Sequence, residues 1–419
     1  MLLDKQILTQ KAGLSWAQLS KPSGFDSYDA LYYACEDSRG RIYAGGQGWV
    51  YYTDNDGISW TATNNGRSDG LVCLYNDSIV SLHTGNGGLK ISTDRGATWS
   101  AISGAGSGNW PLACPLNDDS LIDPGKIDEV CIMLAIKKNG SGSNITYRLY
   151  AYKFNQSNTA FTLDTSNEVN IFYIEPLKMV QCKKVPTGDD EYWMPAGNST
   201  IIQFNASLEL VYQEYSLYGN TPTFRTLNIL NQFTLIDNLT NQYLDMTVHI
   251  HDVCVTNTGR IIVLFSRQDT TSAITLERYY IAYNDTLDIN NWVVPGNSDT
   301  VLGNIIYHES NDIYAKLCAI DNRIMIVCSD SNGWRYSDDD GLTWNTYDPT
   351  QDITALGNSK IVGLPSNKIF YAAPWQMYLS TPTYITVKEL GKHNKYLDRT
   401  GLQEIHTQLM SYIQEVQQS

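Results

Sequence analysis

The chain has 419 residues, which is long for most single domains, and it carries a formal net charge of −15. No basic stripe of the kind that neutralises phosphates occurs, so nucleic acid is excluded as an expected partner. No apolar run of about 18 residues occurs either, so we expect no membrane insertion. With 42% hydrophobic residues, 28 Tyr and 10 Trp, the composition is typical of many half-buried β-strands.

Residues 1–27 are interpreted as an N-terminal arm. No secretory leader is expected in it, because no charged stretch is followed by an apolar one. The arm contains Gly13-Leu14-Ser15-Trp16, the second half of a pattern that recurs later, with Lys11 where that pattern has an acidic residue. A strand from this arm could complete the last unit of a repeat architecture and so protect the edge between first and last units.

Three segments share the pattern (Ser/Thr)-x-(Asp/Asn)-x-Gly-x-(Ser/Thr)-Trp. The Asp or Asn side chain can accept hydrogen bonds from turn amides, and glycine permits a positive φ. The hydroxyls can hold the ends of the turn, and the tryptophan anchors the next strand. The residues that carry the pattern are Thr53, Asn55, Gly57 and Trp60, then Ser92, Asp94, Gly96 and Trp99, and then Ser337, Asp339, Gly341 and Trp344.

This pattern resembles the Asp-box, the hairpin motif of sialidase-type β-propellers. The first two segments begin 39 residues apart, and a period of about 40 to 50 residues is typical of a four-stranded propeller blade. The resemblance implies an all-β fold, a seven-bladed β-propeller, with six or eight blades as alternatives. The predicted blades are 28–62, 68–102, 110–164, 168–215, 248–293, 313–347 and 352–385, with 216–247 either an insertion or part of an eighth blade.

A sialidase-like glycoside hydrolase is one function that the resemblance raises. It implies a site at the central end of the blades, with three arginines that hold a carboxylate, a Tyr–Glu pair and an Asp acid. Sialidases usually carry the first arginine in Arg-Ile-Pro or Arg-Leu-Pro. Arg41, Arg148, Arg260 and Arg323 are followed by Ile or Leu but not then by Pro, and each follows a turn, where we expect a solvated strand-end charge. No catalytic residue is therefore assigned.

No metal or cofactor is expected. His249 and His251 share one face of a predicted strand, which is compatible with a metal site but more typical of an ordinary strand. The segments 54–57 and 330–333 resemble pieces of calcium loops without their full spacing, and turn chemistry explains both better. The eight cysteines form no Cys-x-x-Cys pair and are interpreted as small buried side chains.

The character of the sequence changes after residue 388. Residues 28–388 are assigned to the propeller and 389–419 to a short C-terminal α-helix for oligomerisation or attachment. Thr400 and Gln403 are typical of a capping box at the start of that helix. Two interpretations stay open, an amphipathic helix packed on the propeller and a self-associating helix, possible as a homotrimer. Its apolar seam consists of Leu402, Ile405, Leu409, Tyr412 and Val416.

The segment Tyr396–Gln403 resembles a tail segment common in structural proteins of bacteriophages. This resemblance implies a non-enzymatic virion protein, a tail, fibre or decoration component made in the host cytoplasm. Its propeller would bind a cell-surface glycan or a neighbouring virion protein, and its helix would bring several copies together. The alternatives are the sialidase-like hydrolase and a cytoplasmic scaffold propeller that binds other proteins.

Overall fold

The residues that the computed structural model describes form β-strands and turns. The described residues contain no helix, and hence none that is long and apolar enough to cross a membrane. The prediction of an all-β fold is confirmed. The described residues are 11–22, 31–46, 49–66, 68–74, 76–83, 87–102, 105, 108–115, 133–140, 146–154, 161–172, 180–182, 191–196, 200–205, 214–215, 222–223, 247–256, 258–269, 276–285, 293, 315–320, 323–328, 334–347, 360–373 and 376–384.

Two predictions fall largely outside this part of the chain. The C-terminal helix over 389–419, with its seam of apolar residues, lies outside the described residues. The segment 216–247 is described only at Pro222–Thr223 and at Thr247, so its role as an insertion or as part of an eighth blade stays a prediction.

Four sheets consist of four consecutive antiparallel strands each. The first sheet is β2 (Leu31–Glu36), β3 (Ile42–Gly46), β4 (Val50–Thr53) and β5 (Thr61–Ala62). The second is β6 (Gly70–Cys73), β7 (Ile79–Leu82), β8 (Leu89–Ser92) and β9 (Ser100–Ala101). The third is β10 (Asn109–Pro115), β11 (Met133–Asn139), β12 (Thr146–Phe154) and β13 (Phe161–Phe172). The sixth is β22 (Ala315–Ile320), β23 (Arg323–Cys328), β24 (Arg335–Ser337) and β25 (Asn345–Thr346).

The remaining sheets depart from this plan. The fourth contains β14 (Val180–Cys182), β15 (Glu191–Ala196) and β16 (Thr200–Asn205), and a separate pair follows it, β17 (Glu214–Tyr215) with β18 (Pro222–Thr223). The fifth contains β19 (Thr247–Val255), β20 (Ile261–Asp269) and β21 (Leu276–Asn284). The seventh combines β26 (Lys360–Gly363), β27 (Ile369–Ala373) and β28 (Gln376–Tyr384) with β1 (Lys11–Gln18), which lies next to β28.

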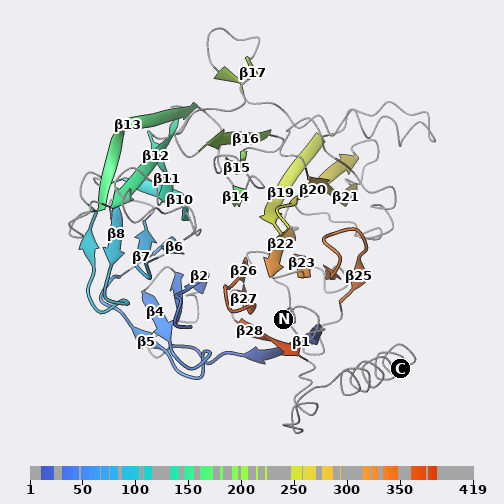
Figure 1. The fold of residues 1–419 in the computed structure, drawn as a ribbon, viewed down its shortest axis with the longest axis horizontal. Coiled ribbons are helices and arrows are strands. Elements are labelled where there is room, and N and C mark those ends of the chain that lie inside the picture. The colour runs from blue at the N-terminus through green and yellow to red at the C-terminus, as the bar shows by residue number, and fades with distance from the viewer. Residues whose placement is uncertain are drawn as a thin grey trace, which may run out of the picture. The chain divides into compact units, whose positions relative to one another are not determined.

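By its internal contacts the chain divides into a large unit, Trp16–Ser380, and a small unit that combines Met1–Ser15 with Thr381–Ser419. Within the large unit the first strands of successive sheets contact one another in the order β2, β6, β10, β14, β19, β22 and β26, and β26 contacts β2 again. Figure 1 shows these sheets following one another in chain order, from blue to red. A closed order of small sheets is what radial repetition produces. The number of blades stays a prediction.

One predicted blade boundary is wrong. Residues 168–172, expected to begin the fourth blade, belong to β13 of the third sheet, where Phe172 pairs with Thr146. The reason is the length of β12, whose nine residues all pair with β13. The register shift between Tyr150 and Ala151 absorbs extra residues without ending the strand.

The hydrophobic core lies between neighbouring sheets. Tyr43 of the first sheet packs with Leu71 of the second, and on the other face Ile42 packs with Phe370 of the seventh. Because both faces of a sheet are covered, its strands become nearly continuous apolar runs, and all five residues of β3 are buried. The outer strands β5, β9 and β25 have two exposed residues each, which leaves only a short edge for another chain to pair with.

Candidate functional site

The three repeated segments form the same connection in three sheets. They join β4 to β5, β8 to β9 and β24 to β25, so each links the third strand of a sheet to its outer strand. In an antiparallel sheet this connection lies at the same end as the one between the first two strands. We call this end the turn face and the opposite end the loop face. The segments are named the first turn (Thr53–Trp60), the second turn (Ser92–Trp99) and the third turn (Ser337–Trp344).

Trp60, Trp99 and Trp344 occupy equivalent positions in these turns. In each case the residue after the tryptophan pairs with the strand that precedes the turn. The pairs are Tyr52 with Thr61, Ile91 with Ser100, and Tyr336 with Asn345.

Hydrogen bonds within eight residues close the second turn. Ser92 Oγ donates to Asp94 Oδ1 over 2.8 Å and accepts the N–H of Gly96 over 2.8 Å. Asp94 also accepts the N–H of Thr98 over 2.8 Å and its hydroxyl over 2.5 Å. Trp99 Nε1 donates to the carbonyl of Gly96 over 3.2 Å. Burial alone would raise the pKa of Asp94, but the hydrogen bonds from Thr98 and Ser92 hold it below its usual value.

The third turn repeats this geometry. Ser337 Oγ donates to Asp339 and accepts the N–H of Gly341, each over 2.8 Å. Asp339 accepts the N–H and hydroxyl of Thr343, and Trp344 Nε1 donates to the Gly341 carbonyl over 3.0 Å. The pKa of Asp339 is lowered in the same way, with burial opposing the hydrogen bonds from Thr343 and Ser337.

The first turn differs at its tryptophan. Thr53 Oγ1 accepts the N–H of Gly57 over 2.9 Å, but Trp60 Nε1 is buried and has no hydrogen-bond partner. The Gly57 carbonyl instead accepts the hydroxyl of Ser20 over 2.9 Å. Asn55, in the place of the aspartate, accepts the N–H of Ser59 over 3.0 Å. The N-terminal segment therefore takes the acceptor that the tryptophan uses in the other two turns.

An arginine at the start of the second strand of the sheet joins this arrangement. In the first sheet Arg41 Nε and Nη2 donate to the two carboxylate oxygens of Asp54 over 2.7 and 2.8 Å. The guanidinium carbon of Arg41 lies 4.0 Å from the centre of the Tyr52 ring. Hydrogen bonding to Asp54 raises the pKa of Arg41 and lowers that of Asp54, although burial opposes both changes. The guanidinium is thus held by a carboxylate and an aromatic face.

The same constellation recurs in two other sheets. Arg260 pairs with Asp285 over 2.6 and 2.9 Å and lies over Tyr283. Arg323 pairs with Asp338 over 2.6 Å at both oxygens and lies over Tyr336.

The expectation of solvated strand-end arginines is wrong for these three. Arg41, Arg260 and Arg323 have side chains that are 16%, 14% and 5% exposed. A sequence signal was present, because each partner aspartate stands two residues after a tyrosine at the end of the third strand. The side chain of Arg148 is not among those that the structure describes.

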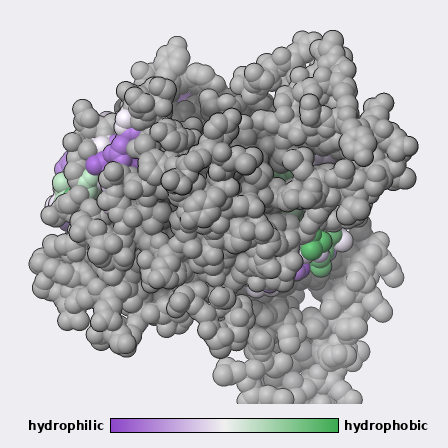
Figure 2. Space-filling view, turned by 90° about the horizontal axis from the view of Figure 1, so that it is seen from above, coloured by the Kyte–Doolittle hydropathy of each residue, from purple (hydrophilic) through white to green (hydrophobic). Residues whose placement is uncertain are grey.

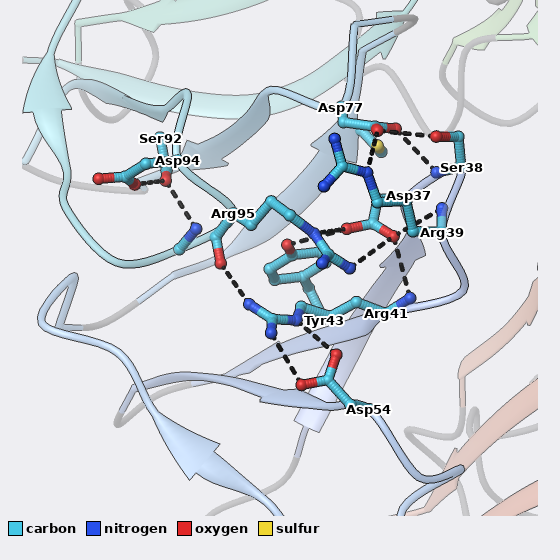
Figure 3. A network of polar contacts seen from close by, with 12 residues as sticks. Asp37, Ser38, Arg39, Arg41, Tyr43, Asp54, Asp77, Ser92, Asp94 and Arg95 are labelled. Carbon is cyan, nitrogen blue, oxygen red and sulfur yellow. Dashed lines mark hydrogen bonds and ion pairs between the residues drawn. The ribbon is translucent and has the colours of Figure 1, made fainter.

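Charged contacts also cross from the second sheet to the first (Figure 3). Arg95, the fourth residue of the second turn, donates to the carboxylate of Asp37 over 2.7 and 3.2 Å. Arg41 Nη1 donates to the carbonyl of Arg95 over 2.8 Å. Asp77 of the second sheet accepts both the N–H and the hydroxyl of Ser38 over 2.7 Å. We call Asp37, Ser38, Arg41, Asp54, Asp77 and Arg95 the inter-sheet clamp.

The fourth residue of the other two turns makes the corresponding contact with the preceding sheet. Asp340 accepts Arg260 Nη1 at its carbonyl over 2.8 Å and binds the hydroxyl of Thr258 through its carboxylate. Asp56 forms an ion pair with Lys368 of the seventh sheet. The fourth residue contacts the preceding sheet in all three turns, although its type differs from one turn to the next.

The electrostatics of the clamp favour its ionised form. Burial alone would raise the pKa of Asp37, but Arg95 and the N–H groups of Arg41 and Arg39 hold it below its usual value. The pKa of Tyr43 is raised, first by burial and then by the charge of Asp37, to which its hydroxyl donates over 3.2 Å. The charged groups of the clamp are thus arranged to hold neighbouring sheets together.

The described residues contain no group of three His, Cys, Asp or Glu side chains placed to hold a metal ion. The register of β19 shifts between Ile250 and Asp252, so His251 is a bulged residue. A bulge breaks the alternation on which a shared face for His249 and His251 depends.

The five cysteines whose side chains the structure describes are all free thiols. Burial raises the pKa of Cys35 well above its usual value, and burial followed by the charge of Asp77 raises that of Cys73 to about 12. Thiols of this kind are poor nucleophiles at neutral pH. The five are Cys35, Cys73, Cys114, Cys254 and Cys318.

Comparison with known proteins supports the architecture. A family model described as the DUF6242 beta propeller domain matches residues 4–185. The chain is a β-propeller. Similar solved structures include virginiamycin B lyase from Staphylococcus aureus, with 8% identity and a TM-score of 0.47 over 88% of this chain and 99% of that chain. YCF48 from Cyanidioschyzon merolae has 12% identity and a TM-score of 0.45, over 88% and 99%.

The ancestral GH74 enzyme AFV00434 has 13% identity and a TM-score of 0.50, over 89% of this propeller but only 47% of its own chain. At such identities the likeness concerns the fold alone. No curated protein matches the sequence.

Proposed function

We propose that this β-propeller is a non-enzymatic binding protein of a bacteriophage virion, a tail, fibre or decoration component. The observation that supports a non-enzymatic role is the use of Arg41, Arg260 and Arg323. Each donates two hydrogen bonds to an aspartate of its own sheet. A sialidase-type site needs arginines that are free to hold a substrate carboxylate, and these three are already engaged by internal carboxylates.

The three turns are, in this proposal, Asp-boxes with a structural role. Their aspartate or asparagine side chains accept hydrogen bonds from within the same turn, so they are occupied in holding the backbone. The fourth residue of each turn then contacts the neighbouring sheet, which gives the repeat a purpose in assembling the propeller.

The virion setting rests on the sequence of the tail. The segment Tyr396–Gln403 resembles a tail segment of phage structural proteins, and the apolar seam that begins at Leu402 is suited to a homotrimer. Copies joined in this way would present several propellers to a cell-surface glycan or a neighbouring virion protein, and weak single contacts would add up.

Light scattering tests the assembly. We expect the full chain to have the mass of an oligomer, most simply a trimer, and a chain that lacks residues 396–419 to have the mass of a monomer. A full chain that is monomeric, or a truncation that changes neither mass nor attachment of the virion to its host, contradicts the proposal.

Two assays on the purified full chain test the functional part. A panel of fluorogenic glycosides should show no turnover, and a glycan array together with binding to purified virion proteins should show a partner. Turnover on the panel would support the sialidase-like alternative instead. A partner among host cytoplasmic proteins that binds equally well without the tail would support the scaffold alternative.

A further inference from the structure

An exposed tryptophan lies at the loop face of the first sheet. Trp49 immediately precedes β4, whereas the first turn follows the other end of that strand. Its relative exposure is 47%, although tryptophans such as Trp110 and Trp334 are 1% and 0% exposed. About half of the surface of Trp49 is therefore accessible to a ligand.

The corresponding positions in two sister sheets carry no side chain. The pairing with the outer strands aligns the third strands of the three sheets. The aligned segments are Val50–Thr53, Leu89–Ser92, and Trp334 with Arg335–Ser337. The residue before them is Trp49 in the first sheet, Gly88 in the second and Gly333 in the sixth. An aromatic residue at this point is therefore not required in every sheet.

An exposed polar residue lies at the same end of the sheet. Thr63 N–H donates to the Val50 carbonyl over 2.8 Å, which extends the register of β4 and β5 by one pair, and the next residue, Asn64, begins a turn. Asn64 is exposed. A flat apolar ring and an exposed amide at one end of a sheet suit a pyranose, whose C–H groups stack on an aromatic face while its hydroxyls bind amides.

The other exposed apolar side chains do not extend this surface. Among the described residues, Ile58 and Leu342 are 77% and 49% exposed and lie in repeated turns at the turn face, and Val293, which is 45% exposed, pairs with Tyr283 of the fifth sheet. Among the residues that are coloured in Figure 2, the hydrophobic ones form small separate areas. A protein partner usually requires a cluster of anchors surrounded by a rim. A single exposed ring favours a small, flat group such as a sugar.

The charge of the protein narrows the class of glycan. The net charge is −15, and Arg41, Arg260 and Arg323 are held by internal carboxylates. The overall field therefore repels sialylated or uronic-acid glycans.

We propose that Trp49, with Asn64 at the same end of the sheet, is the stacking platform for a pyranose ring of an uncharged glycan at the loop face. This inference rests on the glycan-binding branch of the proposed function and adds to it a site and a class of sugar.

The experiment uses the full chain on an array of neutral hexose oligosaccharides and sialylated oligosaccharides. The dissociation constant for the tightest neutral oligosaccharide is then measured by titration calorimetry for wild type, Trp49→Ala, Trp49→Phe and Asn64→Ala. Leu342→Ala is the matched control, because its side chain is equally exposed but lies at the turn face. We expect Trp49→Ala to weaken binding at least about tenfold and Trp49→Phe to retain most of it. Asn64→Ala should have an intermediate effect and Leu342→Ala none.

Melting temperatures should be unchanged in all four variants, since each residue is exposed. Should Trp49→Ala fail to fold, Asn64→Ala and Trp49→Phe still decide the matter through their affinities. Wild-type binding to neutral glycans that Trp49→Ala and Asn64→Ala leave intact would overturn this site but not the proposed function. Tightest binding to sialylated oligosaccharides would overturn the uncharged class. An array without any glycan binding would overturn the glycan branch itself, and this site with it.

Discussion

Arg41, Arg260 and Arg323 show how a charged side chain can be buried at the seam of a β-propeller. The guanidinium is planar and weakly hydrated, so it can lie on a tyrosine ring while both edges of its fork meet a carboxylate. Each partner aspartate stays about half exposed, with side-chain exposures between 47% and 55%. Water therefore screens part of the attraction, and the hydrogen-bond geometry and the packing of the arginine stem matter as much as the charge.

Arg323→Ala is expected to lower the free energy of unfolding by about 2 kcal/mol, because a nearly buried side chain with two charged hydrogen bonds is lost. Arg323→Lys should recover only part of this, since lysine has no planar fork. Arg39→Ala is the control. Its side chain is 69% exposed and its nearest carboxylate oxygen is 3.9 Å away, so the change should be below about 0.5 kcal/mol. Urea denaturation measures all three, and equal losses for Arg323→Ala and Arg39→Ala would contradict the assignment.

The stability of the protein is expected to depend on pH through four aspartates, Asp37, Asp54, Asp94 and Asp339. Their folded-state pKa values are lowered, so the unfolded chain takes up protons first as the pH falls. The stabilisation they provide is fully present above the unfolded value of about 3.9 and is lost as the pH falls through the folded values. Asp37→Asn removes one such group, so its destabilisation should be larger at pH 7 than at pH 3. Urea midpoints of wild type and variant across this range test the prediction, and a constant difference would refute it.

At the scale of elements, the repeated turn both closes its own backbone and contacts the neighbouring sheet. Its hydroxyl, carboxylate and glycine close the backbone, and two successive residues with positive φ turn the chain: Asp340 and Gly341, with φ of 61° and 83°, in the third turn. Two reasons favour glycine at position 341: its positive φ and the close approach of a side chain from the neighbouring sheet. A Cβ on Gly341 would be 2.9 Å from Ile262 Cδ1 of the fifth sheet.

Gly341→Ala should therefore cost more than backbone strain alone. Gly40 has the same φ of 83°, but a Cβ there would meet nothing within 4 Å. We expect about 1 kcal/mol for Gly40→Ala and about 1 to 3 kcal/mol more for Gly341→Ala, because the second change also overpacks the seam. Thermal and urea unfolding of both variants provide the comparison. An equal decrease in the free energy of unfolding for the two variants would contradict the predicted clash between a Cβ at position 341 and the neighbouring sheet.

The fifth sheet has a strand pairing like that of the sixth. Tyr283 forms an isolated bridge with Val293, and Val293 follows Trp292 in the sequence. Tyr336 and Asn345 pair in the same way in the sixth sheet, where the sequence has one residue fewer between the strand and the tryptophan. Because of this difference, a search with fixed spacing does not find Trp292.

At the scale of the whole molecule, the N-terminal segment connects three sheets of the large unit. Trp16 Nε1 donates to the hydroxyl of Tyr347 in the sixth sheet. Leu19 N–H donates to the Met377 carbonyl in the seventh over 2.8 Å, and Ser20 bonds to the first turn. The segment thus spans the seam at which the repeat begins and ends.

Removal of residues 1–20 is expected to lower the melting temperature by more than about 5 °C or to abolish cooperative unfolding, because a strand and these contacts are lost together. Removal of residues 1–10 alone is the control and leaves all three contacts in place. Circular dichroism melts measure both truncations. Equal melting temperatures for the two would mean that the seam does not depend on this segment.

The turn chemistry was predictable, because Ser92, Asp94, Gly96, Thr98 and Trp99 act on one another within eight residues. The inter-sheet clamp was not. Arg95 and Asp37 are separated by 58 residues, and nothing in either segment alone shows that they meet. The arginines of the second strands were misjudged for the same reason, since their burial depends on the third strand of the sheet and on the sheet packed against it.

The sequence by itself determined the β-strands, the repeated turns and the propeller class, since these follow from local hydrogen bonding and from a period that one unit can express. Only the tertiary structure decided which charges cross the seams, where the third sheet ends and how Ser20 replaces a tryptophan at the first turn. Those outcomes depend on which faces of neighbouring sheets pack together. Contacts between residues far apart in the sequence are determined by the packing of all the sheets and not by any single segment.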